Sequence, residues 1–287
     1  GAIKIARTYG ELNFEKKRYK IITLENSFHG RTITTVKATG QSSFHQSKFA
    51  PYPDGFSFNA IDDVYNAIDD ETVAVMIELV QGEGGVFPFD KEKIKELAKF
   101  LKENDILLII DEVQTGVFRT GEFLASNLYE IEPDIITLAK GIGGGVPMGA
   151  VITKHKDIWT AGDHGSTFGG NYLVTAAALE VLDILENLKD SGTLDETIIY
   201  FTKKLNDIFE ANRDIFITHV GLGLMRGLRV KDADTLASLI KTAFECGVMV
   251  LKSGNNTLRF LPALTISKSE IDEGFIRLQK AITKIKS

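Results

Sequence analysis

The chain has 287 residues, a net charge of −6 at pH 7, 44% hydrophobic residues and 25% charged residues. This composition excludes intrinsic disorder, which needs low hydrophobicity and high net charge. The net negative charge and the lack of a long basic run disfavour a nucleic-acid-binding protein. The single cysteine, Cys246, excludes an intrachain disulfide framework and a cysteine-rich zinc site. No apolar stretch reaches membrane-spanning length and no secretory signal opens the chain, so we expect a cytoplasmic protein with no membrane partner.

Short apolar runs alternate with amphipathic helical patterns in the first part of the chain. The segment 90–103 is predicted to be a helix that starts at Asp90, because its apolar residues recur with helical spacing. The middle apolar runs have no polar position, which is typical of strands buried on both faces of a parallel sheet. This alternation predicts an α/β fold with a mostly parallel central sheet and helices on both faces. Strands are predicted at 19–24, 73–77, 106–110, 134–138 and 148–153.

The pattern changes after Asn171, where longer helices dominate. We predict a large domain over residues 1–188 and a smaller C-terminal α/β domain over residues 189–287. The chain also begins without Met inside a helical pattern, so we expect the start of the large domain to be missing. In the second part, helices are predicted at 173–188, 194–209, 233–244 and 269–285, and strands at 224–230, 248–251 and 257–261.

Charged residues follow three of the predicted strands. They are Glu78, Asp111 and Lys140, and they fall where open α/β sheets bind ligands. A strand end that reaches solvent would explain any one of them, but three successive strands ending this way favour a site. A lysine that attacks a carbonyl and an aspartate that pairs with a pyridine nitrogen are what pyridoxal phosphate needs. A structural Lys–Asp ion pair would give the same spacing.

Glycines cluster around the same strand ends, so dinucleotide binding has to be tested. The pattern G-x-G-x-x-G fails at residues 141–146 and again at 221–226, and no phosphate-binding loop of the G-x-x-x-x-G-K-[ST] type occurs. A nicotinamide-linked oxidoreductase is therefore disfavoured. The five histidines are scattered without metal-ligand spacing, so we expect no metal.

Six motifs occur in order and together resemble one family. The chain is similar over essentially its whole length to the class-III, ornithine-type, pyridoxal-phosphate aminotransferases, and most like members that act on N2-acetyl-L-ornithine. The resemblance implies the fold type I architecture of PLP-dependent transferases, with a large cofactor-binding domain and a smaller C-terminal domain. The motifs are FHGRT (28–32), ELVQGEGG (78–85), DEVQTG (111–116), LAKGIGGGVPMGA (138–150), GDHGSTFGGN (162–171) and LRFLPAL (258–264).

The resemblance also implies which residues hold the cofactor. Lys140 resembles the lysine that forms a Schiff base with pyridoxal 5'-phosphate and moves the substrate proton, and Asp111 resembles the partner of the pyridine nitrogen. The other residues implied to hold the cofactor are Val113 behind the ring, Gln114 at its phenolic oxygen, Phe28 on its opposite face, Glu78 near the cofactor, and Ser166 and Thr167 at the phosphate of a neighbouring subunit. Ordinary core packing is the alternative for the two apolar residues, Phe28 and Val113. Local hydrogen bonding is the alternative for the two hydroxyl residues. The last pair implies a homodimer with a composite active site.

Two arginines resemble the groups that bind substrate carboxylates. They are Arg31 and Arg259, and Glu83 matches a glutamate that covers the second arginine until a 2-oxo acid enters. A static Glu83–Arg259 salt bridge is the alternative. The implied reaction moves the terminal amino group of N2-acetyl-L-ornithine to 2-oxoglutarate, giving N-acetylglutamate 5-semialdehyde and glutamate in arginine biosynthesis. Ornithine, succinylornithine and 4-aminobutyrate remain alternative donors.

A protein of another class also fits the sequence. In the family, a Ser-Gly-rich turn that precedes the position of Gly1 binds the cofactor phosphate at a helix N-terminus. A chain that truly lacks this turn would be a truncated, non-catalytic PLP-binding remnant.

Overall fold

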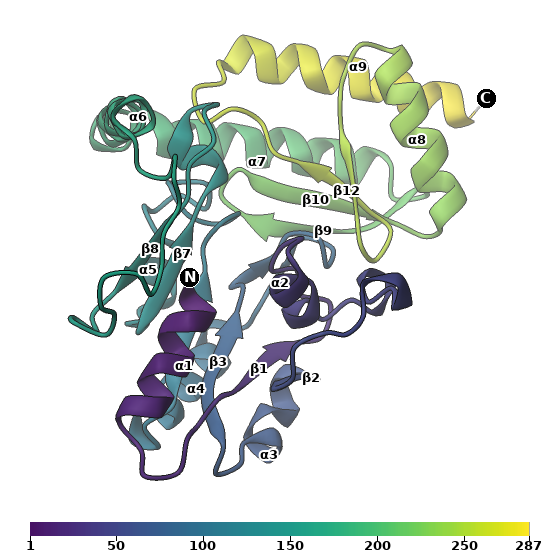
Figure 1. Cartoon of the computed structure of the whole chain (residues 1–287). Helices are drawn as coiled ribbons and strands as arrows, with labels where there is room; N and C mark the ends of the chain where they lie inside the picture. Colours follow the sequence, from purple (N-terminus) through teal and green to yellow (C-terminus); the bar gives the residue numbers. More distant parts are fainter. Residues whose placement is uncertain (287) are drawn as a thin grey trace. The chain divides into compact units, whose positions relative to one another are not determined.

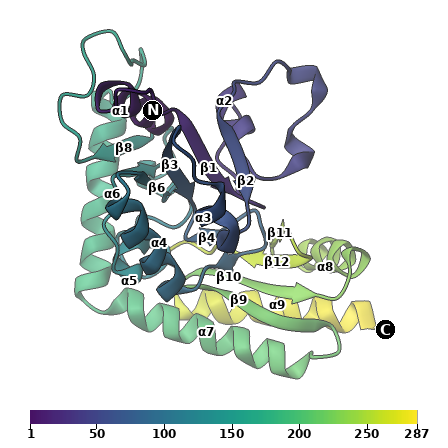
Figure 2. The ribbon, with the colours of Figure 1, turned by 90° about the horizontal axis from the view of Figure 1, so that it is seen from below.

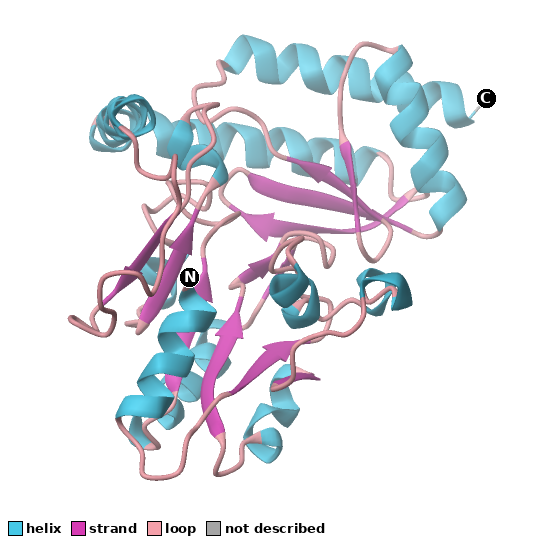
Figure 3. Ribbon diagram, viewed as in Figure 1, coloured by secondary structure: helices cyan, strands magenta, loops and turns pink. Residues whose placement is uncertain are grey.

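The computed structural model describes residues 1–286, which form two compact units (Figures 1 and 3). Unit 1 comprises Gly1–Leu79, Phe89–Val117 and Leu124–Val181. Unit 2 comprises Val80–Pro88, Phe118–Phe123 and Leu182–Ser287. The division of the chain into a large and a small domain at residue 188 stays a prediction.

Unit 1 is built on a sheet with the strand order β2-β1-β3-β6-β7-β8. Its strands are parallel except for β8, which runs antiparallel to β7. The predicted mostly parallel sheet is therefore confirmed, and β3 and β6 are buried at every residue, as their apolar sequences require. The bounds are β1 Lys20–Leu24, β2 Phe56–Asn59, β3 Thr72–Ile77, β6 Leu107–Asp111, β7 Ile135–Leu138 and β8 Ala150–Thr153.

Helices α1 and α4 cover opposite faces of this sheet (Figure 2). The apolar side of α1, with Ile3 and Ile5, packs against Met76 and Ile109 of the strands. Helix α4 begins where the sequence predicts, because the Asp90 side chain accepts a hydrogen bond from the Lys93 N–H at 3.0 Å. The α-helices of unit 1 are α1 Ala2–Leu12, α2 Ile33–Ala38, α3 Val64–Ala67, α4 Lys91–Glu103 and α5 Ala125–Tyr129.

Unit 2 is built on an antiparallel sheet with the strand order β11-β12-β10-β9. The rings of Phe201, Phe260 and Phe275 meet in its core at centroid separations of 5.2–6.3 Å. A short hairpin, β4 Val80–Gln81 and β5 Phe87–Pro88, also belongs to this unit. The strands are β9 Phe216–Leu222, β10 Met225–Val230, β11 Leu251–Ser253 and β12 Thr257–Phe260, and the helices are α7 Thr193–Ala211, α8 Ala233–Glu245 and α9 Lys268–Lys286.

Helix α6, Tyr172–Asp190, contains the boundary between the two units. It matches the long helix predicted after Asn171. Over residues 1–286, no helix combines the length and the apolar character that crossing a membrane would need.

The predicted strand at 248–251 is wrong in its position. The Gly247 N–H bonds the Phe244 carbonyl at 2.9 Å, and the Val248 N–H bonds the Ala243 carbonyl at 3.0 Å. These two bonds form a Schellman motif that ends α8, so Val248 completes the helix and the strand starts only at Leu251. Strands β2 and β9 were not predicted, because they are edge strands with polar residues inside them.

Candidate functional site

The carboxylate of Asp111, at the end of β6, is buried in unit 1 and has three polar neighbours. Its Oδ1 accepts hydrogen bonds from the Thr137 hydroxyl at 2.9 Å and from the Val113 N–H at 3.1 Å. Its Oδ2 lies 2.8 Å from the His29 Nδ1. Thr137 reaches Asp111 because the two residues are partners in the register of β6 and β7. Three separate segments therefore supply donors to one buried carboxylate.

Burial and hydrogen bonding act in opposite directions on this pair. Burial would raise the pKa of Asp111, but the hydrogen bond and charge of His29, with the Val113 and Thr137 bonds, hold that pKa below its usual value. Burial would lower the pKa of His29, but Asp111 and the nearby charge of Glu78 raise that pKa overall. The site thus favours a histidine cation beside an aspartate anion. Within residues 1–286, the buried Nε2 of His29 has no hydrogen-bond partner.

A glycine allows the FHGRT loop to send neighbouring side chains in different directions. Gly30 has a φ of +133°, and a Cβ added there would lie 2.7 Å from the Thr35 Oγ1, so a side chain would meet both strain and a clash. On one side of Gly30 the His29 side chain is only 1% exposed, while on the other side Arg31 is exposed. The loop therefore delivers one buried and one accessible cationic side chain within three residues.

Glu78 and Lys140 follow β3 and β7, as the sequence predicts. Glu78 is buried and accepts a hydrogen bond from the Phe28 N–H at 2.9 Å, which fixes the FHGRT loop to the end of β3. Lys140 is exposed and starts a short 3₁₀ helix, Lys140–Gly143, with a φ of +50°. A left-handed conformation is costly for a residue with a side chain and recurs at functional sites.

The remaining candidates of unit 1 are less tightly held. Val113 and Gln114 are half-buried in the turn that follows β6. Ser166 and Thr167 are exposed, and the Ser166 Oγ accepts a hydrogen bond from the Gly169 N–H at 3.1 Å. Among residues 1–286, no hydrogen bond joins Ser166 or Thr167 to another candidate of the site.

Unit 2 brings Glu83 and Arg259 together. The Arg259 guanidinium donates to the Glu83 Oε1 at 2.7 Å and to the Gly82 carbonyl at 3.1 Å. The loop that carries Glu83 is held by the turn after β11, through a hydrogen bond of 2.9 Å from the Gly254 N–H to the Glu83 carbonyl. Such a pair is compatible both with a static salt bridge and with a carboxylate that another carboxylate can replace.

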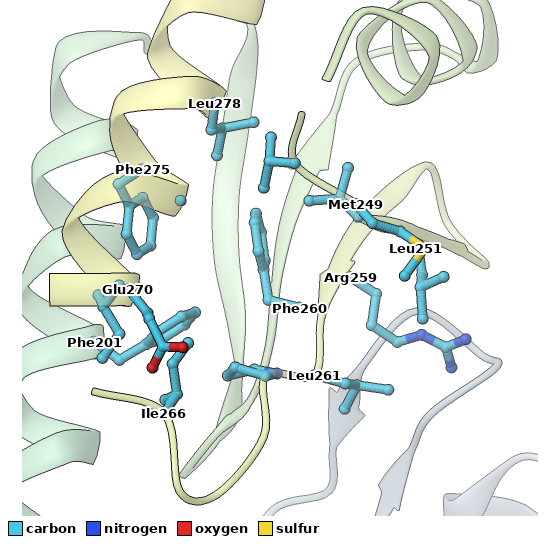
Figure 4. A pocket seen from close by; sticks show the side chains of 15 residues that line it. Phe201, Met249, Leu251, Arg259, Phe260, Leu261, Ile266, Glu270, Phe275 and Leu278 are labelled. Atoms are coloured by element: carbon cyan, nitrogen blue, oxygen red, sulfur yellow. The ribbon is translucent and has the colours of Figure 1, made fainter. Parts of the chain in front are cut away.

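A cavity of about 320 Å³ lies in the apolar layer of unit 2 (Figure 4). Phe260 points into it toward Phe275 and Leu278 of α9, whereas the guanidinium of the adjacent Arg259 points away from these side chains. The cavity is therefore a gap in the packing between helix and sheet, and the charged group of Arg259 is turned away from it.

Two residues of the Asp111 cluster escaped the sequence analysis. His29 lies inside the FHGRT motif, but no role was predicted for it, and Thr137 lies within an apolar strand that was not expected to contribute a site residue. The register of two parallel strands could have found Thr137, because it stands beside Asp111. No sequence pattern indicates that His29 rather than Phe28 turns toward Asp111, since this depends on the conformation of Gly30.

Comparison with known proteins gives consistent matches. The family model described as aminotransferase class-III matches residues 1–282. The chain is 56% identical to the acetylornithine aminotransferase of Wolinella succinogenes over 99% of the chain and 73% of that protein. It is 40% identical to the succinylornithine transaminase of Salmonella paratyphi B, over 100% of the chain and 71% of that protein. A solved ornithine aminotransferase of Toxoplasma gondii, described with partial occupancy of PLP at its active site, has a TM-score of 0.90 at 29% identity, over 99% of this chain and 70% of that one.

Proposed function

The chain belongs to the class-III aminotransferases, which depend on pyridoxal phosphate, and on this basis we propose that it transfers the terminal amino group of N2-acetyl-L-ornithine to 2-oxoglutarate. The products are N-acetylglutamate 5-semialdehyde and glutamate, and the step belongs to arginine biosynthesis. The observation that carries the proposal is the buried Asp111 carboxylate, kept ionised by His29, Val113 and Thr137. The 56% identity to an acetylornithine aminotransferase supports this amino donor over the alternatives.

The donor set of unit 1 fits the cofactor. An ionised carboxylate suits a protonated pyridine nitrogen, an exposed lysine suits the cofactor aldehyde, and the ring of Phe28 suits a planar heterocycle. When bound, pyridoxal phosphate supplies an electron sink for the bond broken at the substrate carbon. Lys140 would hold the cofactor and carry the substrate proton, while Asp111 would keep its charge next to the ring. Gln114, Val113 and Glu78 would support the ring from β3 and from the turn after β6.

Arg31 and Arg259 account for two substrates that differ in their number of carboxylates. N2-acetylornithine has one carboxylate, which we assign to Arg31, and 2-oxoglutarate has two. We assign the second to Arg259, which Glu83 neutralises while the amino donor is bound. The close Glu83–Arg259 contact supports this assignment because it satisfies Arg259 when no second carboxylate is present.

We further propose a cytoplasmic homodimer. Ser166 and Thr167 are exposed and resemble residues that reach the cofactor phosphate of a neighbouring subunit, which supports a composite site. Exposed apolar side chains at the start of α6, including Tyr172 and Leu173, support a second copy as the partner.

The test is a panel of half-reactions. The holoenzyme is mixed with one amino donor at a time and no oxo acid, and the loss of the visible absorbance of the lysine-bound cofactor is followed. N2-acetylornithine should react faster than ornithine, succinylornithine or 4-aminobutyrate. A faster reaction with succinylornithine would replace the donor and leave the reaction class intact. Full turnover by Lys140→Ala would refute the transaminase mechanism itself.

A further inference from the structure

The guanidinium of Arg31 lies over two aromatic rings of unit 1. Its central carbon is 5.4 Å from the ring centroid of Phe28 and 4.9 Å from that of Phe44. The two rings meet edge to face, with centroids 5.3 Å apart and an interplanar angle of 64°. The two distances from the Arg31 guanidinium carbon to the ring centroids fall within the range of favourable cation–π contacts. Arg31, Phe28 and Phe44 thus form one cluster, which we call the aromatic clamp.

The clamp holds Arg31 without using its charge in an ion pair. Within residues 1–286, Arg31 makes no salt bridge and no hydrogen bond through its side chain, and it is exposed. Arg259, by contrast, is already paired with Glu83. Aromatic faces contact the flat side of a guanidinium and leave its in-plane N–H donors available. A carboxylate can therefore bind Arg31 in a fork without displacing a protein anion.

The backbone on either side of the clamp is also fixed. Thr32 precedes α2 as its N-cap, and its N–H donates to the Thr35 Oγ1 at 3.0 Å. The conformation of Gly30 sets the direction in which the chain enters that cap. Phe44 comes from a different segment, the 3₁₀ helix Ser42–Phe44, and is half-buried. The loop therefore places the Arg31 backbone, and Phe44 limits where its long side chain can go.

We propose that Phe44 is a positioning residue, which holds Arg31 against Phe28 and presents the guanidinium to the carboxylate of the amino donor. This rests on the proposed function for the identity of the donor. An unclamped arginine would have to be ordered each time a substrate binds.

The test compares two amino donors that differ only in the carboxylate. N-acetyl-1,4-diaminobutane has the acetamide and the terminal amine of N2-acetylornithine but lacks its carboxylate. In the holoenzyme, Phe44→Leu should lower kcat/KM for N2-acetylornithine about two- to fivefold, mainly through KM, as expected for the loss of a cation–π contact at an exposed arginine. It should leave the slower reaction of N-acetyl-1,4-diaminobutane unchanged. Phe44→Tyr keeps a ring face and should restore the wild-type values.

Phe49→Leu is the matched control, because Phe49 lies in the same loop and has Lys48 over its ring at 5.1 Å. It should change neither donor. The visible absorbance of the bound cofactor and the thermal unfolding temperature report whether Phe28 and the fold are intact in each variant. An equal loss for both donors would overturn the proposal, and so would no loss for either.

A direct binding measurement separates this proposal from the proposed function. The dissociation constant of pentanoate, a simple carboxylate, is measured by calorimetry on the wild type, Phe44→Leu and Phe49→Leu. Binding should weaken about two- to fivefold in Phe44→Leu alone, whichever amino donor the enzyme uses. If pentanoate binds the wild type and Phe44→Leu equally well, the clamp has no role in carboxylate binding. If no donor reacts with the wild type but pentanoate binding still depends on Phe44, the proposed function fails and the clamp stands.

Discussion

Asp111 shows how a buried carboxylate can keep its charge. Removal from water favours the protonated acid, which could not balance a positive pyridinium nitrogen. Three donors from the FHGRT loop, the following turn and the neighbouring strand reverse that preference. Of the three, only His29 brings a positive charge, so its removal should have the largest effect.

We expect His29→Ala to lower kcat/KM about ten- to hundredfold, because hydrogen bonds to charged groups contribute about 1.5–3 kcal/mol. The dissociation constant of the cofactor, measured by fluorescence titration, should rise in parallel. His29→Asn keeps an amide N–H in the place of Nδ1 but lacks the positive charge, so its loss of kcat/KM should be smaller than that of His29→Ala. If His29→Ala and the wild type bind the cofactor equally well, His29 does not support Asp111.

The same pair predicts a dependence of stability on pH. The pKa of His29 is raised in the folded protein above its usual 6.5, so its contribution is fully present below that pH and is lost as pH rises through the folded pKa. The pKa of Asp111 is lowered below 3.8, so its contribution is present above that pH and is lost as pH falls through the folded pKa. Urea unfolding of the wild type and His29→Asn should therefore differ more at about pH 5 than at about pH 8.5. An equal difference at the two pH values would contradict a charged His29.

Sequence reasoning could place the ends of strands but not the direction of side chains in a loop. Asp111 and Lys140 were predicted because apolar runs end just before them, and the structure has both there. His29 was missed because its orientation depends on the φ of Gly30 and on a contact with a residue 82 positions away. The roles of all these residues in catalysis stay predictions that the variants above can test.

At the scale of the elements, glycines at two positions should respond oppositely to the same change. Gly247 ends α8 with a φ of +83°, so Gly247→Ala should lower the free energy of unfolding by about 1 kcal/mol. Gly274 lies inside α9, and an added Cβ there meets nothing within 4 Å, so Gly274→Ala should raise it by about 0.5–1 kcal/mol. Urea denaturation measures both. A loss of stability in Gly274→Ala would mean that α9 does not tolerate a methyl group there.

Periodicity predicted the long helices and the central strands because these elements carry their own pattern of burial. Strand β3 is apolar and buried throughout, and α4 shows the spacing of a helix with one buried side. The edge strand β9 carries Thr218, His219 and Gly221, so its sequence resembles a loop and it is a strand only because β10 pairs with it. The sequence prediction placed β11 too early in the chain. The first residues of the apolar run at 248–251 belong to the end of α8, where the Val248 N–H bonds the Ala243 carbonyl.

At the scale of the whole molecule, the apolar surface at the start of α6 bears on assembly. Tyr172 is 95% exposed, Leu173 73% and Leu179 63%. Tyr172 and Leu179 are seven residues apart and lie on one side of the helix, and Leu173 is the next residue after Tyr172. We call these three residues the α6 stripe, and a group of highly exposed apolar side chains such as this usually marks an interface. The proposed homodimer would bury it.

We therefore expect Leu173→Glu to raise the dissociation constant of the dimer about a hundredfold or more, because a carboxylate would be buried without a partner. Sedimentation velocity over a range of concentrations measures this shift. Affinity for the cofactor should fall with it, since Ser166 and Thr167 are proposed to serve the neighbouring subunit. Ile276→Glu is the control, as Ile276 is 63% exposed on α9, outside the stripe, and should leave the dimer intact. If the wild type sediments as a monomer, or if only Ile276→Glu dissociates, the α6 stripe is not the dimer interface.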